Sequence, residues 1–263
     1  MSNSGIQLIA LPDFPLIQPG DDLFDLILKG LSRAGETLAA GDILVVAQKI
    51  VSKAENRYVE LSNITPSPKA QDLAKQVEKD SRLVEVILSE SNEVVRTCPG
   101  VLVVEHKLGY VMANAGVDAS NIKHAGSAES RTGDRVLLLP TNPDGSAAEL
   151  AKSLSQHGGC PVGVIINDSV GRAWRNGTVG LALGAAGFPA LYDRRGEQDL
   201  FGRTLEVSEV ALADQVAAAA ALVQGEGDEG LPVVLVRGVS WPETALPNNA
   251  ETLLRPKHKD LFR

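Results

Sequence analysis

The sequence predicts an α+β fold in which mixed sheets are flanked by helices. Segments with helical spacing of apolar residues alternate with short runs of branched apolar residues that are typical of strands. Two such runs are joined by a tight turn, which predicts a hairpin and argues against a purely parallel, doubly wound sheet. The composition agrees, because 44% of the 263 residues are hydrophobic and only 4% are aromatic, so small and branched side chains must fill the core.

The first half of the chain supplies clear helix and strand signals. Residues 16–20 are typical of an extended segment that ends in a turn, and Asp21 and Asp22 then cap a helix whose apolar stripe runs from Leu23 to Leu31. The other elements expected here are a buried strand at 43–46, a strand at 57–61, a helix that opens at 66–68, a helix capped at 80–81, and a hairpin of 101–105 with 110–113.

The second half repeats the alternation of helix and strand. We expect helices at 144–157 and 207–223 and a final strand at 232–236. An apolar run at 162–166 is typical of a strand buried on both faces, and it leads directly into Asn167, Asp168 and Ser169. The tail, residues 239–263, is rich in turn residues and ends in Lys and Arg, so we expect it to be loosely held.

Charge and cysteine content exclude several classes of protein. Lys and Arg total 25 and Asp and Glu total 33, which gives a net charge of −8. Such a chain has no general attraction to nucleic acid or to anionic lipid. No apolar run approaches the ~18 residues that cross a bilayer, no basic secretion signal is visible, and the 2 cysteines are too few for a disulfide scaffold. A cytoplasmic protein with no nucleic-acid or membrane partner is expected.

Three familiar site motifs do not apply. No Walker phosphate loop and no H-E-x-x-H zinc motif is present, and the four histidines are scattered. Residues 225–230 match G-x-G-x-x-G, but they follow a helix instead of opening one, and they carry three carboxylates that would repel a bare phosphate. The position of this motif in the chain therefore argues against a Rossmann-type dinucleotide-binding site.

Acidic residues in three separate loops point to a metal ion. Glu226 is flanked by glycines, Asp118 lies in a loop of small and polar residues (114–121), and Asp168 with Ser169 follows the buried strand. Carboxylate oxygens hold hard divalent cations, which in turn carry phosphate oxygens. Each loop alone could be a solvated turn, but the three together favour one shared site.

Cations near these loops favour a phosphorylated ligand. Arg172 and Arg175 enclose Ala173 and Trp174, and guanidinium groups suit phosphate or carboxylate oxygens, although a pair of surface salt bridges is the plain alternative. Lys53, in the cationic segment 48–53, could neutralise a phosphate or could simply pair with Glu55. Carboxylates and cations together indicate a nucleoside triphosphate bound with metal.

Five blocks of sequence carry a resemblance to a known family. They are residues 16–23, 41–55, 114–121, 138–147 and 168–172, in that order. The chain resembles the coenzyme F420-0:L-glutamate ligases, the γ-glutamyl ligases of deazaflavin coenzyme biosynthesis. The resemblance covers residues 6–238 as one family unit with two structural lobes, and leaves 239–263 as a C-terminal tail.

This resemblance implies a GTP-dependent amide ligation. The carboxylate of the lactyl-phosphate tail of coenzyme F420-0 would attack the γ-phosphate of GTP to give an acyl phosphate, and the amine of L-glutamate would then displace phosphate. The family implies Mg²⁺ or Mn²⁺, a K⁺ ion, and an intertwined homodimer of two-part subunits.

The resemblance also implies roles for individual residues. Those expected to bind the nucleotide are Phe14, Pro15, Leu16, Ile17, Gln48, Lys49, Lys53, Asn121, Gln224, Gly225 and Gly227. Asp118, Asp168, Ser169 and Glu226 match metal positions, with Ser169 standing where Thr is usual. Lys53, Arg172 and Arg175 are expected to be catalytic, the arginines by binding the phosphoryl group or an acidic end of the substrate. Residues 124–134 form a longer loop than in many relatives, which leaves the acceptor's tail and the number of glutamates open.

Other functions remain possible at this point. The same acidic loops would serve a metal-dependent nucleotide hydrolase or phosphotransferase, which needs no glutamate. A ligase acting on a different acidic acceptor, or an oligomeric protein that only binds a phosphorylated metabolite, would also fit.

Overall fold

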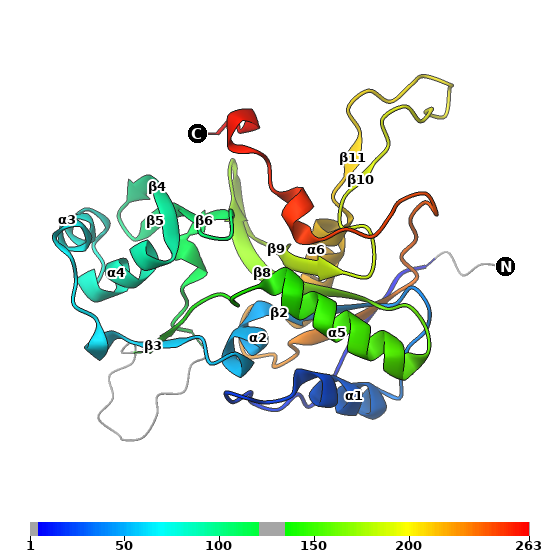
Figure 1. Ribbon diagram of the computed structural model, residues 1–263, viewed down its shortest axis with the longest axis horizontal. Helices are drawn as coiled ribbons and strands as arrows, with labels where there is room; N and C mark the ends of the chain where they lie inside the picture. The colour runs from blue at the N-terminus through cyan, green and yellow to red at the C-terminus, as the bar shows by residue number, and fades with distance from the viewer. Residues whose placement is uncertain (1–4, 121–134, 263) are drawn as a thin grey trace.

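A mixed five-stranded sheet forms the centre of the larger lobe in the computed structural model, which describes residues 5–120 and 135–262 (Figure 1). In spatial order its strands are β1 (Gln7–Ala10), β12 (Val233–Arg237), β2 (Ile43–Ala47), β8 (Gly163–Arg172) and β9 (Arg175–Ala186). Only the β2–β8 pair is parallel, and the other three pairs are antiparallel. The mixed sheet predicted from the sequence is confirmed.

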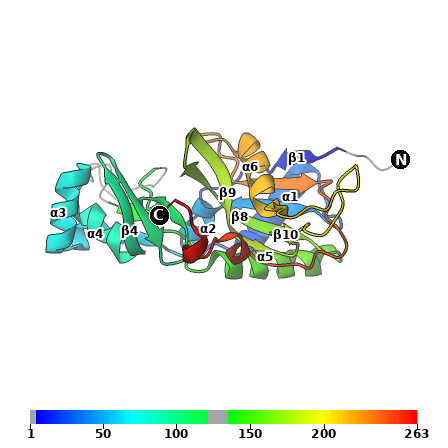
Figure 2. The same cartoon turned by 90° about the horizontal axis from the view of Figure 1, so that it is seen from above.

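Helices cover both faces of this sheet because its central strands are apolar on both sides. Leu44 and Val46 pack against α1 (Leu23–Ala34) and α5 (Pro143–Gly158), while Ile43 and Val45 pack against α6 (Leu212–Gln224). Figure 2 shows α5 and α6 on opposite sides of the strands. Each half of the larger core thus uses alternate residues of the same strands.

The smaller lobe lies at one end of the molecule and has its own apolar core (Figure 2). It consists of α3 (Pro68–Val77), α4 (Ser81–Ser89) and an antiparallel sheet of β4 (Ser91–Cys98), β5 (Val101–His106) and β6 (Val111–Ala113). The predicted β5–β6 hairpin is confirmed. A two-stranded ladder of β3 (Tyr58–Glu60) and β7 (Arg135–Leu137) lies between the lobes.

The predicted helix starts are confirmed by their caps. The Asp22 carboxylate accepts from the Phe24 backbone N–H at 2.9 Å, and Asp80 accepts from the Arg82 N–H at 2.8 Å. Each carboxylate satisfies an amide that has no partner within its own helix. The fifth helix begins at Pro143, one residue before the predicted start, with Asn142 as its cap.

Two predicted boundaries are wrong. The strand predicted at 162–166 continues to Arg172 as β8 and turns into β9, so Asp168 lies within a strand and not in a loop beyond it. The helix predicted at 207–223 begins at Leu212, because β11 (Glu209–Val210) pairs with β10 (Tyr192–Asp193) in a separate hairpin. That hairpin carries an arm, residues 192–210, that stands away from the body (Figure 1).

The C-terminal tail is held in place, contrary to expectation. Ala250 is fully buried, the Trp241 ring lies 6.0 Å from that of Phe188, and Lys257 forms an ion pair with Glu93 at 2.6 Å. The tail contacts the larger lobe at Phe188 and the smaller lobe at Glu93, and it forms two short helical turns on the way, Ala250–Leu253 and Lys257–Lys259. Apolar anchors hold the tail despite its turn-rich sequence.

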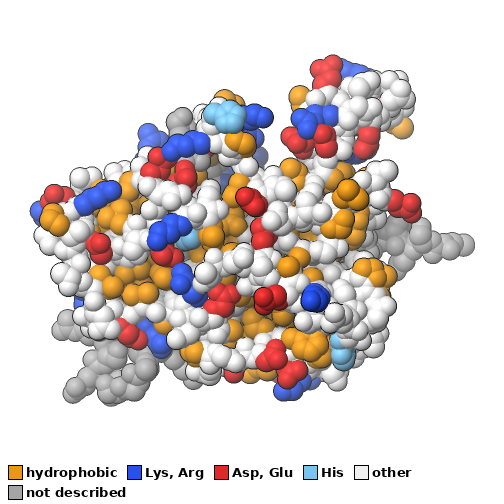
Figure 3. Space-filling model, viewed as in Figure 1, with side chains coloured by type: hydrophobic (Ala, Val, Ile, Leu, Met, Phe, Trp, Pro, Cys, Tyr) orange, Lys and Arg blue, Asp and Glu red, His pale blue; other side chains and the backbone are white. Residues whose placement is uncertain are grey.

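The distribution of charged side chains on the surface agrees with a negative net charge. On the face drawn in Figure 3, acidic and basic side chains of the described residues are interspersed, without a continuous basic area. None of the helices in residues 5–120 and 135–262 is both long and apolar enough to span a membrane.

A buried histidine in the smaller lobe should make stability sensitive to acid. His106 Nδ1 accepts from the Leu108 N–H at 2.9 Å, and its Nε2 lies 3.8 Å from a Glu90 oxygen. Burial lowers the pKa of His106 below 6.5, and the Glu90 charge only partly opposes this. Below pH 6.5 the unfolded chain therefore binds a proton that the folded chain resists, and stability is lost as pH falls.

We expect His106→Asn, which keeps an acceptor for the Leu108 N–H, to flatten this dependence. Between about pH 7.5 and about pH 5.5 the wild type should lose about 1 kcal/mol more unfolding free energy than the variant. Urea unfolding at both pH values measures this difference. The control His258→Asn alters an exposed histidine and should behave as wild type; equal losses in all three proteins would contradict the prediction.

Candidate functional site

Three chain segments meet at one edge of the central sheet. Because β2 and β8 run parallel, with Ala47 paired to Asn167, both strands end their apolar runs at this edge. Helix α2 (Gln48–Ala54) begins directly after β2. Strand β12 runs the opposite way, so the loop before it arrives at the same edge, where the Pro232 carbonyl accepts from the Ala47 N–H at 2.8 Å.

A cavity of about 870 Å³ lies between these segments, a size typical of a small-molecule site. Most of the predicted site residues line it, namely Phe14, Pro15, Leu16, Ile17, Gln48, Lys49, Lys53, Asp118, Asp168, Ser169, Gln224, Gly225, Glu226 and Gly227. Asn121 and the loop 124–134 lie outside the described residues. Positions more than 200 residues apart in sequence therefore line one cavity, as expected for a shared site.

One carboxylate is held by a cation from the opposite wall. Lys49 Nζ lies 2.7 Å from Asp118 Oδ2 and donates to Ser120 Oγ at 2.8 Å. The Ser120 N–H donates to Asp118 Oδ1 at 2.7 Å, which fixes the turn. Burial would raise the pKa of Asp118, but Lys49 and Ser120 together hold it below its usual value, so this group is an anion at neutral pH.

The second carboxylate is in a less favourable setting. The pKa of Asp168 is raised to about 7, mainly by burial and in addition by the charges of Asp118 and Glu226, against a hydrogen bond from the Ser169 N–H and the charge of Lys49. Glu226 Oε1 instead accepts from Ser169 Oγ at 2.8 Å and from Thr178 Oγ1 at 3.2 Å. The negative charges of Asp118 and Glu226 thus disfavour ionisation of Asp168, so this part of the cavity lacks positive charge.

This donor set fits a hard divalent cation. Carboxylate and hydroxyl oxygens from Asp118, Asp168, Ser169 and Glu226 are the ligand types that Mg²⁺ and Mn²⁺ prefer. Among residues 5–120 and 135–262, no three acidic, His or Cys side chains are already gathered closely enough to hold an ion. Binding would require Asp118 to leave Lys49 and Glu226 to turn from its two hydroxyl partners.

Lys53 lies on α2, one helical turn beyond Lys49, on the cavity wall. Burial and the neighbouring Lys49 charge lower the pKa of Lys53, and Asp118 partly restores it. Two lysines at this spacing repel each other, and an anionic group between them would relieve the repulsion. The α2 wall therefore suits phosphate oxygens.

The loop after α6 carries an acceptor that sequence reasoning missed. Glu229 folds back so that its Oε2 accepts from the Gly227 N–H at 2.8 Å. Hydrogen bonds from the loop's backbone amides lower the pKa of Glu229. Amides that hold a carboxylate in this way are able to hold a phosphate oxygen.

Comparisons with known proteins show the family of this chain. Residues 13–238 match the family model described as F420-0:Gamma-glutamyl ligase. The chain belongs to this family. A coenzyme F420:L-glutamate ligase of Methanothermobacter thermautotrophicus is 44% identical over 98% of this chain and 99% of its own length, and one of Methanopyrus kandleri is 43% identical over the same shares. One of Archaeoglobus fulgidus is 38% identical over 98% of this chain and 96% of its own length.

In this F420-0:γ-glutamyl ligase family member, a buried amide pair supports the cavity floor and was not predicted. Asn167 Nδ2 donates to Gln224 Oε1 at 2.7 Å, and Gln224 Nε2 donates to Asn167 Oδ1 and to the Pro232 carbonyl, both at 3.2 Å. The Gln224 amide, predicted to bind nucleotide, is thus occupied by its own chain. The sequence signal that could have indicated a role for Asn167 is its position as a polar residue directly after an apolar run.

The two predicted catalytic arginines do not line the cavity. Arg172 and Arg175 face each other across the tip of the β8–β9 hairpin and are exposed, because β8 continues beyond Ser169 instead of ending there. Within one chain they therefore lie away from the cavity lining, where the phosphoryl group is expected. Their position suits the second predicted role, at an acidic end of the substrate.

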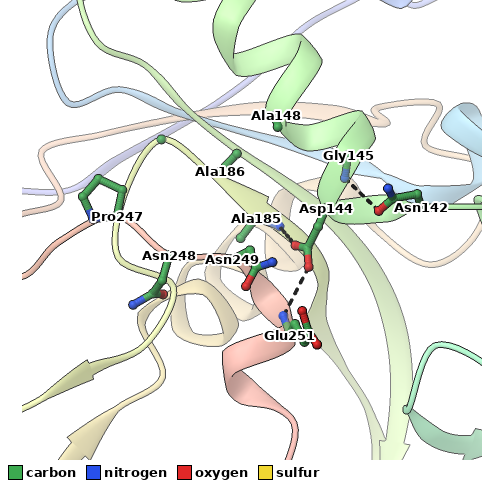
Figure 4. Close-up of a pocket in the computed structure, with 11 residues that line it drawn as sticks. Asn142, Asp144, Gly145, Ala148, Ala185, Ala186, Pro247, Asn248, Asn249 and Glu251 are labelled. Atoms are coloured by element: carbon green, nitrogen blue, oxygen red, sulfur yellow. Dashed lines mark hydrogen bonds between the residues drawn. The ribbon is translucent and has the colours of Figure 1, made fainter.

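A second hollow, of about 660 Å³, belongs to the framework of this ligase-family fold (Figure 4). Asp144, at the start of α5, accepts there from the backbone N–H groups of Ala185 at 2.8 Å and Ala250 at 2.9 Å. Its carboxylate therefore joins α5, β9 and the C-terminal tail. The predicted nucleotide and metal residues are absent from its lining.

Proposed function

We propose that this protein is a GTP-dependent ligase that joins L-glutamate to the lactyl-phosphate carboxylate of coenzyme F420-0. The observation that carries the proposal is the single cavity in which carboxylates from three separate chain segments face two lysines. Family membership supplies the acceptor and the amino acid, since the relatives are coenzyme F420:L-glutamate ligases. The guanine nucleotide, the ions and the acyl phosphate come from the resemblance noted above.

The chain's own groups have defined tasks in this proposal. Lys49 and Lys53 neutralise the phosphate oxygens, and the loop amides near Gly227 orient them. Phe14 to Ile17 form the apolar side of the cavity, where the base would pack. Asp118, Asp168, Ser169 and Glu226 would hold a divalent cation, which when bound supplies charge neutralisation at the phosphates.

The chemistry then needs positioning more than acid–base groups. The acceptor carboxylate attacks the γ-phosphorus, the bond to the GDP oxygen breaks, and an acyl phosphate forms. The glutamate amine attacks the acyl carbon and loses a proton, and phosphate leaves. Holding the reactants in line is then the main contribution of the chain to the rate.

The test is a mass analysis of product after incubation with GTP, Mg²⁺ or Mn²⁺, L-glutamate and coenzyme F420-0. A gain of one or more glutamyl units that requires GTP is expected, and ATP should substitute poorly. Release of GDP without glutamate or acceptor would instead establish the hydrolase alternative. Omission of K⁺ shows whether the monovalent ion is needed. No product with any nucleotide would overturn the proposal.

We further propose that the subunits form a homodimer through the arm. Leu200, Phe201 and Val207 on this arm are 92%, 91% and 84% exposed, and several large exposed apolar side chains on one element are typical of an interaction surface. Burying them against a second copy would remove this apolar surface from water.

Phe201→Asp should therefore yield a monomer, as measured by size-exclusion chromatography with light scattering. Leu222→Asp, which places the same charge at an exposed apolar site on α6, should stay dimeric. A dimeric Phe201→Asp protein would refute this use of the arm.

A further inference from the structure

The tip of the β8–β9 hairpin lies directly beyond the cavity. Ser169 on β8 and Thr178 on β9 both donate to Glu226 and line the cavity. Three residues further along each strand, Arg172 pairs with Arg175 across the ladder. At the rise of a strand this separation is about 10 Å. The tip therefore continues the cavity's rim instead of forming a separate surface.

An aromatic surface is exposed at this tip. Trp174 is 86% exposed, and its ring centroid lies 6.1 Å from that of Phe262 in the C-terminal tail, which is 61% exposed. The tail brings Phe262 to this point from the far end of the sequence. Large aromatic side chains are usually covered in folded proteins. These two exposed rings are tilted by 56° to each other, so a flat group can stack on one of them and meet the other at its edge.

The backbone at the tip is strained around this tryptophan. Trp174 has φ of +64°, in the left-handed region that bulky residues rarely occupy. Glycine would adopt this turn at lower cost, so the fold alone does not favour tryptophan here. Backbone strain of this kind is typical of residues at active sites and ligand-binding sites.

Positive charge surrounds the rings. Arg172 and Arg175 are exposed, and within residues 5–120 and 135–262 neither guanidinium has an ion-pair partner. In a chain of net charge −8, two such cations side by side are a local exception. They suit a ligand that is both flat and anionic.

We infer that the hairpin tip binds the acceptor, with Trp174 stacking on its planar deazaflavin ring, Phe262 contacting the edge of that ring, and the two arginines contacting its phosphodiester. This inference rests on the proposed function. The acceptor's phosphate-linked tail then extends along the rim to place its carboxylate in the cavity, while the nucleotide occupies the α2 wall. The tip is thus a specificity site for the acceptor, separate from the nucleotide site.

Steady-state kinetics with each substrate varied separately tests this assignment. We expect Trp174→Gly to raise the KM for the acceptor about tenfold or more, the loss typical of removing a stacking aromatic. The KM for GTP should not change, and thermal stability should stay equal or rise because glycine relieves the strained turn. A purely structural tryptophan would lower stability and leave the acceptor's KM unchanged.

Companion variants separate the two kinds of contact. Trp174→Phe should keep most of the affinity, and Arg172→Gln with Arg175→Gln should raise the acceptor's KM and remove its dependence on salt. The control Lys29→Gln with Lys152→Gln removes two exposed positive charges elsewhere and should leave both KM values unchanged.

Binding without turnover distinguishes failure of this inference from failure of the proposed function. The chain has 2 tryptophans, so Trp241→Phe leaves Trp174 alone to report on the tip. Titration of that protein with coenzyme F420-0 should quench its fluorescence. Ligation that proceeds with an unchanged acceptor KM in Trp174→Gly, or titration without quenching, would overturn the inference. Quenching without ligation would instead refute the proposed reaction.

Discussion

Asp168→Asn should abolish ligation and at the same time make the ligand-free protein more stable. The carboxylate lies where burial and the charges of Asp118 and Glu226 all oppose its ionisation, which raises its pKa to about 7. Asparagine keeps an oxygen for the Ser169 N–H, which now donates to Asp168 at 2.9 Å, and removes only the charge. The ionised Asp168 carboxylate therefore lowers the stability of the ligand-free fold, and we expect it to be kept for its role in the reaction.

The loss of the Asp168 charge should change both activity and stability by large amounts. Activity should fall about a hundredfold or more, because a lost anionic ligand removes charge stabilisation worth several kcal/mol. Unfolding free energy should rise by about 1–2 kcal/mol at neutral pH. The folded wild type carries a proton that the unfolded chain releases between the ordinary pKa of 3.8 and about 7, so the variant's advantage should grow as pH rises through this range.

Denaturant unfolding at several pH values, together with the mass-based ligation assay, measures both effects. Asp80→Asn is the matched control, because the pKa of that carboxyl is lowered, mainly by its hydrogen bond with Arg82, and because Asp80 caps α4 and pairs with Arg82 outside the cavity lining. It should keep full activity and gain no stability. An active Asp168→Asn protein, or one less stable than wild type, would contradict the assignment.

The edge of the sheet could be located from sequence because its signals are local. Apolar runs at 43–46 and 162–166 predicted buried strands, and polar residues directly after each run predicted where side chains would gather. Their parallel pairing then brings Lys49 and Asp168 to one cavity. Helix caps such as Asp22 and Asp80 were equally readable, since capping depends on neighbours two or three residues away.

Features set by distant contacts could not be predicted in this way. Strand β9 is rich in glycine and alanine, so it lacks the branched side chains that mark a strand. Consequently the sequence predicts a loop after residue 166, whereas Arg172 and Arg175 lie at the tip of the β8–β9 hairpin. The tail was misjudged for a similar reason, because the backbone N–H of Ala250 finds its acceptor in Asp144, 106 residues away.

The glycines of β9 are explained by the helices that pack on it. A Cβ at Gly180 would lie 2.5 Å from the Ala217 carbonyl oxygen on α6, and one at Gly184 would lie 2.8 Å from the Asp144 backbone nitrogen on α5. The two helices cover opposite faces of the sheet, and the register shift between the Ile166 and Asn167 pairings is where β9 changes the face it presents. Both helices can approach only because these positions lack side chains.

Gly184→Ala should therefore be among the most damaging single substitutions to the fold. The added methyl would lie inside van der Waals contact with the Pro143 carbonyl, which is backbone and cannot rotate away. Moving the start of α5 would also break the hydrogen bond from the Ala185 N–H to Asp144. We expect a loss of about 3 kcal/mol or more, which corresponds to a fall in Tm of roughly 6–12 °C.

Thermal and urea unfolding measure this loss against Gly171→Ala on the neighbouring strand. A Cβ at Gly171 would meet nothing within 4 Å, so that variant should unfold as wild type does. Equal stability of the two variants would show that α5 can shift without cost. Because Asp144 also holds the tail that carries Phe262, a destabilised Gly184→Ala protein should lose affinity for the acceptor before it loses affinity for the nucleotide.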